Sequence, residues 1–212
     1  MKKSPLIIVF SVLLTASAIF LGYYAVSLVA TTINFEKETK VREKAVIEQI
    51  KNIRTAEFLY KQINSCYTDN FDTLINFILT DSITLEKKIG SADDSVAVAQ
   101  GKVRVEKFKM AVRDSLKRGG VLLTEEQILN LRYIPYAAEG TEYYLQAAKL
   151  DDEAKTPVFE CRAPYKAFLY DLERQELINL INETETVYKK YPGIQIGKLD
   201  ERNNGEGNWG EN

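Results

Sequence analysis

The sequence predicts an α+β protein whose long N-terminal helix leaves a membrane and continues into a domain with a mainly antiparallel sheet. Three observations predict this fold. Residues 5–30 are apolar and uncharged, residues 31–64 have the composition of a helix, and residues 95–164 contain several short runs rich in β-branched and aromatic side chains. The 212 residues suffice for one membrane segment and one domain of about 150 residues, which is large enough to bury its own core.

Charge and composition exclude several classes of function. The 28 basic and 30 acidic residues nearly cancel, and no long run of one sign occurs, so we expect no nucleic acid as a partner. The chain has no histidine, which removes the usual near-neutral acid or base, the commonest zinc ligand and the Ser-His and Cys-His arrangements. Phosphate-loop, dinucleotide-binding and metalloprotease spacings are also absent. We therefore expect no enzyme, no catalytic residue, no metal and no cofactor.

The apolar run from Pro5 to Ala30 predicts a transmembrane helix, because about 20 such residues span a bilayer. Lys2 and Lys3 precede the run, and the first charges after it begin at Glu36. This bias places residues 1–4 in the cytoplasm and the remainder of the chain on the other side.

A cleaved signal peptide is the alternative interpretation of the same segment. Lys2 and Lys3, the apolar stretch to Leu14 and the small residues 16–18 fit its three-part layout. Cleavage would leave residues 19–30 as an exposed apolar N-terminus, so the sequence favours an uncleaved anchor. Both interpretations place the domain outside the cytoplasm.

Residues 31–64 predict a helix that continues out of the membrane, since they contain no glycine or proline. Glu57 and Lys61 form an i,i+4 pair of opposite charge that suits an exposed helix face. One apolar stripe should pack on the following domain, and we expect its later part to consist of Ile53, Ala56, Tyr60 and Ile63. Packing of the earlier part against neighbouring chains is the alternative.

The domain itself is expected over residues 65–199. Asp69 or Asn70 should cap a short helix that carries Leu74 on its buried face, and Thr124 with Gln127 forms a capping box. Residues 95–100 and 102–112 are expected to form a hairpin, and residues 132–136, 141–150 and 156–165 further strands. Residues 165–190 should be mainly helical, and 200–212 a flexible polar tail whose oxygens match no known calcium loop.

Cys66 and Cys161 are the only cysteines. Their separation excludes a C-x-x-C redox or zinc pair. In an oxidising compartment they could form a disulfide that closes a long loop and stabilises by about 4 kcal/mol. Two separate thiols are the other interpretation.

The helical N-terminal pattern, together with Tyr60-x3-Asn64-x2-Tyr67 and a short helix carrying Leu74, resembles type IV pilins and the pseudopilins of type II secretion. The resemblance covers about residues 5–80 and implies a spine helix laid on an antiparallel sheet. Members of the family carry a Gly-Phe-type processing site before the apolar run and a glutamate at the fifth mature position. This chain has Lys-Ser-Pro-Leu at residues 3–6 and no acid in the run, so the resemblance implies a pilin-like shape without the ordinary processing.

These observations predict a non-enzymatic, single-pass protein of the cytoplasmic membrane, with its domain in the periplasm or outside the cell. Its expected partners are the lipid bilayer through residues 5–30 and other envelope proteins or copies of itself. A ligand-binding or sensing ectodomain is the alternative, because six aromatic residues could line a groove, although strands bury such residues routinely: Tyr133, Tyr136, Tyr143, Tyr144, Phe159 and Tyr165. A histidine-free hydrolase is the third possibility.

Overall fold

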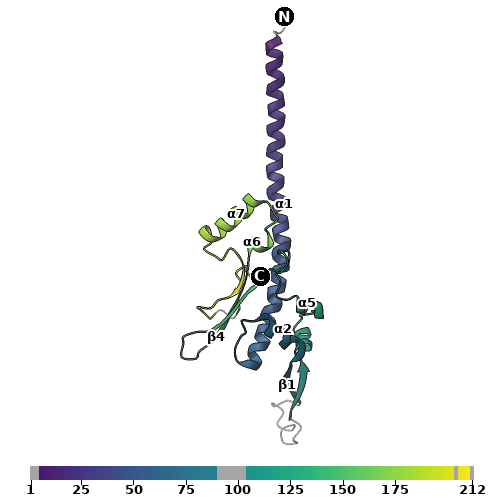
Figure 1. Ribbon diagram of the computed structural model, residues 1–212, viewed down its shortest axis with the longest axis vertical. Coiled ribbons are helices and arrows are strands. Elements are labelled where there is room, and N and C mark those ends of the chain that lie inside the picture. The colour runs from purple at the N-terminus through teal and green to yellow at the C-terminus, as the bar shows by residue number, and fades with distance from the viewer. Residues whose placement is uncertain (1–4, 90–103, 203–204, 211–212) are drawn as a thin grey trace.

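The computed structural model describes residues 5–89, 104–202 and 205–210. Helix α1, Pro5–Asn64, is unbroken over 60 residues, which corresponds to about 90 Å at 1.5 Å per residue. Its first half stands clear of the rest of the chain and its second half lies along the domain (Figure 1). The continuous helix predicted from the sequence is confirmed, while residues 1–4 lie outside the described part.

A short turn connects α1 to α2, Phe71–Thr80. Asn70 is the N-cap of α2, and its side-chain oxygen accepts hydrogen bonds from the backbone N–H groups of Asp72 (2.8 Å) and Thr73 (3.1 Å). Such a cap satisfies donors that the first helical turn leaves unpaired. The helix buries Leu74 as expected, together with Phe71, Ile75, Phe77 and Ile78.

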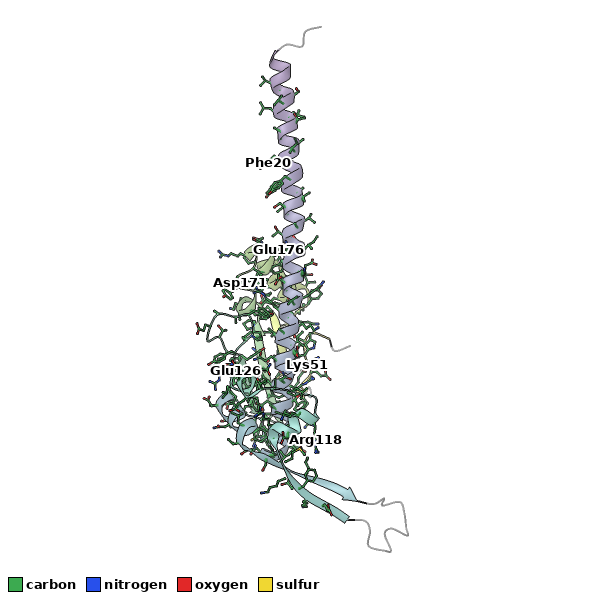
Figure 2. The ribbon with its side chains drawn as sticks, turned by 90° about the vertical axis from the view of Figure 1, so that its right-hand side faces the viewer. Phe20, Lys51, Arg118, Glu126, Asp171 and Glu176 are labelled. Carbon is green, nitrogen blue, oxygen red and sulfur yellow. The ribbon has the colours of Figure 1, made fainter. Side chains whose placement is uncertain are left out.

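Strands β1, Ser82–Ile89, and β2, Arg104–Ala111, form an antiparallel hairpin that projects from the end of the domain (Figure 2). The sequence predicted a hairpin whose second strand, residues 102–112, contains β2. The predicted first strand, residues 95–100, was wrong, because β2 pairs with β1. The partner is the segment directly after α2, in which Ile83 is buried between exposed neighbours. This alternation is typical of a half-buried strand; residues 95–100 lie outside the described ranges.

Two short helices follow the hairpin, α4, Val112–Arg118, and α5, Glu125–Leu129. The capping box of Thr124 and Gln127 at the start of α5 is confirmed. Residues 132–136 do not form the predicted strand, because Tyr136 adopts a left-handed backbone conformation (φ 62°) and only Tyr133 makes a bridge, to Glu142.

The main sheet has the order β3-β4-β5 and is antiparallel throughout. Strands β3, Tyr144–Lys149, and β4, Pro157–Pro164, fall within the predicted segments. Strand β5, Gly193–Gly197, was not predicted. It joins the central strand β4, and both of its glycines lie against the backbone of that strand.

The segment between β4 and β5 is mainly helical, as expected. It contains α6, Tyr165–Phe168, then α7, Arg174–Asn182, and a π-helical turn η1, Glu183–Val187. The predicted flexible tail is wrong for residues 205–210. Gly205 is buried, Gly207 bridges Ile196 of β5, and Asn208 accepts a hydrogen bond from the backbone of Gln195 (3.0 Å).

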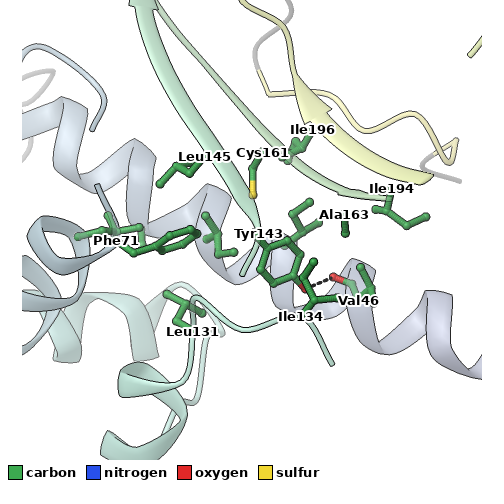
Figure 3. Packing of buried hydrophobic residues seen from close by; sticks show 14 of the residues in the cluster. Val46, Phe71, Leu131, Ile134, Tyr143, Leu145, Cys161, Ala163, Ile194 and Ile196 are labelled. Atoms are coloured by element: carbon green, nitrogen blue, oxygen red, sulfur yellow. Dashed lines mark hydrogen bonds between the residues drawn. The ribbon is translucent and has the colours of Figure 1, made fainter. Parts of the chain in front are cut away.

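The core lies between the second half of α1, α2 and the sheet (Figure 3). Val46, Ile50 and Ile53 of α1 are completely buried. Tyr143, which precedes β3, donates its hydroxyl hydrogen bond to the carbonyl oxygen of Val46 (3.3 Å). The fold is therefore α+β, with a long N-terminal helix packed on small antiparallel sheets.

Candidate functional site

The first candidate functional feature is the bare half of α1. Every residue from Val9 to Ala30 is exposed, and apolar side chains such as Phe20 project from all sides of the helix (Figure 2). A soluble helix normally confines its apolar residues to one stripe, whereas a helix in lipid is apolar all round. With a mean hydropathy of 2.0 over its most apolar window, this segment is long and apolar enough to cross a membrane.

The domain begins to cover α1 directly after this apolar segment. Thr32 donates its hydroxyl hydrogen bond to the carboxylate of Glu176 on α7 (2.7 Å), and Phe35 is buried in the core. Only a few residues therefore separate the end of the apolar run from the folded domain. Such a short connection would hold the domain close to the surface of a membrane that α1 spans.

Arg42 attaches α1 to the segment after α6. Its side chain is buried and donates to the carbonyl oxygen of Phe168 (2.9 Å) and to both carboxylate oxygens of Asp171. The hydrogen bond with Asp171 raises the pKa of Arg42, and the same bond lowers the pKa of Asp171. A bidentate arginine–carboxylate contact fixes the relative orientation of its two groups as well as their distance. The domain therefore cannot rotate freely about α1.

The turn motif occupies the far end of α1. Asn64 is exposed and donates its side-chain hydrogen bond to the carbonyl oxygen of Tyr60 (3.1 Å). Ser65 takes a left-handed conformation (φ 58°), which ends the helix. Tyr67 is half-buried, with its ring centroid 4.6 Å from that of Phe159 on β4. The turn thus closes the spine helix onto the main sheet.

The predicted packing stripe of α1 is correct at its first three positions and wrong at the fourth. Ile53 and Ala56 are buried, and Tyr60 packs edge-on against Phe77 with ring centroids 5.1 Å apart. Ile63 remains 44% exposed. It lies in the last turn of α1, where the chain leaves the helix.

The two cysteines are free thiols, so the candidate disulfide is absent. Tyr67, the neighbour of Cys66, is the turn residue that packs on β4, and its contact there is Phe159. Cys161 lies two residues beyond Phe159 on β4, which is about 7 Å from Phe159 at the rise of a strand. It is completely buried between the sheet and α1 (Figure 3), and burial raises the pKa of its thiol well above the ordinary value.

The exposed position that the sequence predicted for Glu57 was wrong. Glu57 does not pair with Lys61 on an exposed face but is completely buried beneath the turn. One carboxylate oxygen accepts a hydrogen bond from the backbone N–H of Thr68 (3.1 Å). The other is buried and has no hydrogen-bond partner in the part of the chain that the structure describes. Burial raises the pKa of Glu57 to about 8.

Lys61 turns instead toward Tyr67, with its ammonium nitrogen 4.7 Å from the ring centroid and 3.3 Å from the hydroxyl oxygen. The i,i+4 spacing could not show that Glu57 lies on the buried side of α1. Its neighbour Ala56, which belongs to the predicted apolar stripe, was the available signal.

The aromatic residues considered for a groove divide between core and surface. Tyr143 and Phe159 are buried and Tyr165 is half-buried, whereas Tyr133, Tyr136 and Tyr144 are exposed on different segments. Across residues 5–89, 104–202 and 205–210, no three Cys, Asp or Glu side chains gather in a way that could hold a metal ion. Residues 203–204 and 211–212 of the predicted polar tail lie outside those ranges.

The fold and its bare helix define a class: an α+β protein with a long N-terminal apolar helix that is compatible with a single-pass membrane anchor. Comparisons with protein-family models, with curated proteins and with solved structures find no match.

Proposed function

We propose that this chain is a non-enzymatic, single-pass protein of the cell envelope, whose pilin-like domain outside the cytoplasmic membrane serves as a structural or interaction component of a surface or secretion assembly. The observation that carries the proposal is the division of α1 into two halves. One half is bare and apolar, and the other is part of the domain core.

The orientation of the anchor rests on charge. Lys2 and Lys3 precede the apolar run, and no charge follows it before Glu36. Cationic residues flanking a membrane helix remain preferentially on the cytoplasmic side. The domain then lies in the periplasm or outside the cell.

Two features support the comparison with pilins. The helix α1 packs on β5 and, through the turn, on β4 of an antiparallel sheet. The same turn contains the Asn64 and Tyr67 positions on which the resemblance rests. Residues 3–6 lack the family's processing site. The proposal therefore concerns a pilin-like shape and a location outside the cytoplasmic membrane, and it does not include ordinary pilus assembly.

Topology is tested first. A reporter joined after Asn212 should be active only on the outer side of the membrane, and the intact mass of the membrane-bound protein should include residues 5–30. A mature protein that starts at Ile19 or later would contradict the anchor. Cytoplasmic activity of the reporter would contradict the orientation.

Assembly is tested by crosslinking in native membranes. In a chain with Cys66→Ser and Cys161→Ala, a single cysteine is placed at Val41, which is exposed on α1, and the control carries it at the buried Ile50. The proposal expects a covalent adduct, with another copy or another envelope protein, at Val41 and not at Ile50. If Val41 and the exposed Ile33 both give only monomer, the assembly role is wrong.

A further inference from the structure

A pocket of about 320 Å³ lies between the middle of α1, the π-helical turn η1 and the C-terminal residues. Small-molecule sites are usually concave, partly apolar and about 300 Å³ or larger. Its lining includes three aromatic side chains, one carboxylate and one ammonium group, contributed by Tyr165, Tyr188, Trp209, Glu43 and Lys190. None of these residues belongs to the membrane segment, the turn or the packing stripe.

Glu43 supplies the negative charge of the pocket. Burial raises the pKa of Glu43 above its ordinary value, and this effect is larger than the opposing influence of the Tyr165 hydroxyl. The charge of Lys40 lowers the pKa of this carboxylate, but the part of the chain that the structure describes contains no Lys or Arg in ion-pair contact with it. A partly buried acid without a paired cation favours a cation that enters the pocket.

The aromatic side chains supply the second requirement of a cation site. Tyr165, Tyr188 and Trp209 come from three separate segments and all line the same pocket. Electron-rich ring faces attract ammonium groups, and walls of several aromatic residues are suited to quaternary ammonium compounds. The indole N–H of Trp209 is buried without a hydrogen-bond partner among the described residues, and the ammonium nitrogen of Lys51 lies over the same ring, 5.8 Å from its centroid.

Lys190 lines the pocket as well, with its ammonium nitrogen 3.5 Å from the carbonyl oxygen of Asn208. A single carbonyl oxygen does not neutralise an ammonium group. The pocket therefore presents one carboxylate and one ammonium group, an arrangement complementary to a molecule that carries both charges.

The backbone around the pocket is irregular in two places. Residues Glu183–Val187 form a π-helical turn, and Thr184 within it lines the pocket. Lys189 has a left-handed backbone (φ 50°) although it is not a glycine. π-Helical turns occur frequently at functional sites, and strained residues persist where the surrounding structure holds them.

The distance between the pocket and a membrane that α1 spans indicates whether the ligand comes from water or from the lipid headgroups. Glu43 lies 13 residues beyond Ala30 in the same unbroken helix (43 minus 30), which is about 20 Å along the axis. The headgroup layer extends only about 5–8 Å beyond the apolar core of a bilayer. A ligand dissolved in water therefore reaches the pocket more easily than a headgroup of the anchoring membrane.

We propose that this pocket binds a small, water-soluble quaternary ammonium compound that also carries a carboxylate. The ammonium group lies between Glu43 and the aromatic side chains, and the carboxylate lies toward Lys190. This activity is independent of whether the protein joins an assembly.

The test uses the full chain in detergent and three probes of similar size. Glycine betaine carries both charges, 3,3-dimethylbutanoate replaces the ammonium nitrogen by carbon, and choline has a hydroxymethyl group in place of the carboxylate. Binding is followed by calorimetry and by the fluorescence of Trp209, the only tryptophan. We expect saturable binding of betaine and at least about tenfold weaker binding of the other two probes.

The variants separate recognition from folding. Glu43→Gln preserves the shape of the side chain and should weaken betaine about tenfold, whereas Glu48→Gln, at an exposed position of the same helix, should have no effect. Lys190→Gln should weaken betaine while leaving choline unchanged, a pattern that general unfolding cannot produce. No saturable binding of betaine, equal binding of betaine and its carbon isostere, or equal effects of the two glutamate variants would overturn the proposal.

Discussion

The guanidinium of Arg42 on α1 forms two parallel hydrogen bonds with the carboxylate of Asp171, a residue 129 positions later in the chain. A third hydrogen bond, to the carbonyl oxygen of Phe168, and the ring of Tyr136 at 5.3 Å complete the surroundings of Arg42. This contact ties the helix to the half of the domain nearest the bare segment of α1. A domain attached in this way would transmit the orientation of its anchor.

Replacing Arg42 with Met should remove this attachment while retaining an apolar stem of similar length. We expect the free energy of unfolding to fall by about 1–3 kcal/mol, because the Phe168 carbonyl loses its partner while the half-exposed Asp171 can return to water. Denaturant unfolding of the full chain in detergent, followed by Trp209 fluorescence, measures the change. Lys44→Met, at an exposed position of the same helix, is the control and should alter the midpoint little.

Glu57 should make stability depend on pH in the opposite sense to an ordinary surface carboxylate. Its pKa in the folded protein is about 8, against an ordinary value of 4.5. Between these values the folded state retains a proton that the unfolded state releases, so the stabilisation is fully present below pH 4.5 and is lost as the pH rises toward 8. The slope is at most about 1.4 kcal/mol per pH unit.

The measurement compares Glu57→Gln with the parent chain at several pH values between 5 and 8. Glutamine can still accept the hydrogen bond from Thr68 but carries no charge, so the variant should be the more stable protein at the upper end of this range and should show a flatter profile. Parallel profiles for the two proteins would show that Glu57 is not the group responsible.

The parts of the fold that the sequence predicted correctly depend on local signals. Helix α1 follows from an apolar run and the absence of helix breakers, and the cap of α5 follows from the spacing of Thr124 and Gln127. Strand β5 depends instead on backbone pairing with β4 across the intervening helices, and the ordered residues 205–210 depend on pairing with β5. No local pattern records such pairing.

The candidate sites show the same division. Spacing identified Ile53 and Ala56 as core residues, but it could not show that the domain no longer covers α1 at Ile63. The pocket around Glu43 joins α1 to residues that follow Glu43 by 122 or more positions (165 minus 43). Its members appear in the sequence as unrelated aromatic and charged residues, so only the fold could bring them together.

Two isoleucine-to-aspartate substitutions can locate the position along α1 at which the buried core ends. Ile53→Asp places an unpaired charge at a completely buried position and should cost about 3–5 kcal/mol. Ile63→Asp, at a 44% exposed position, should cost less than about 1 kcal/mol. Unfolding of the full chain in detergent provides both values, and a similar loss for the two variants would mean that α1 is covered to its last turn.

Gly197 and Gly140 illustrate two different reasons why a position requires glycine: a left-handed backbone, and close contact with a neighbouring strand. Both have left-handed backbones, with φ values of 73° and 79°. A Cβ atom on Gly140 would meet nothing within 4 Å, whereas one on Gly197 would lie 2.0 Å from the carbonyl oxygen of Phe159 on β4. Gly140→Ala should therefore cost only the backbone strain, about 1–2 kcal/mol, and Gly197→Ala should cost at least about 3 kcal/mol more, because β5 must separate from β4. Thermal or denaturant unfolding of the two variants measures the difference. If both lose the same stability, the contact between β5 and β4 is looser than the structure shows, and the tail that pairs with β5 would lose its support as well.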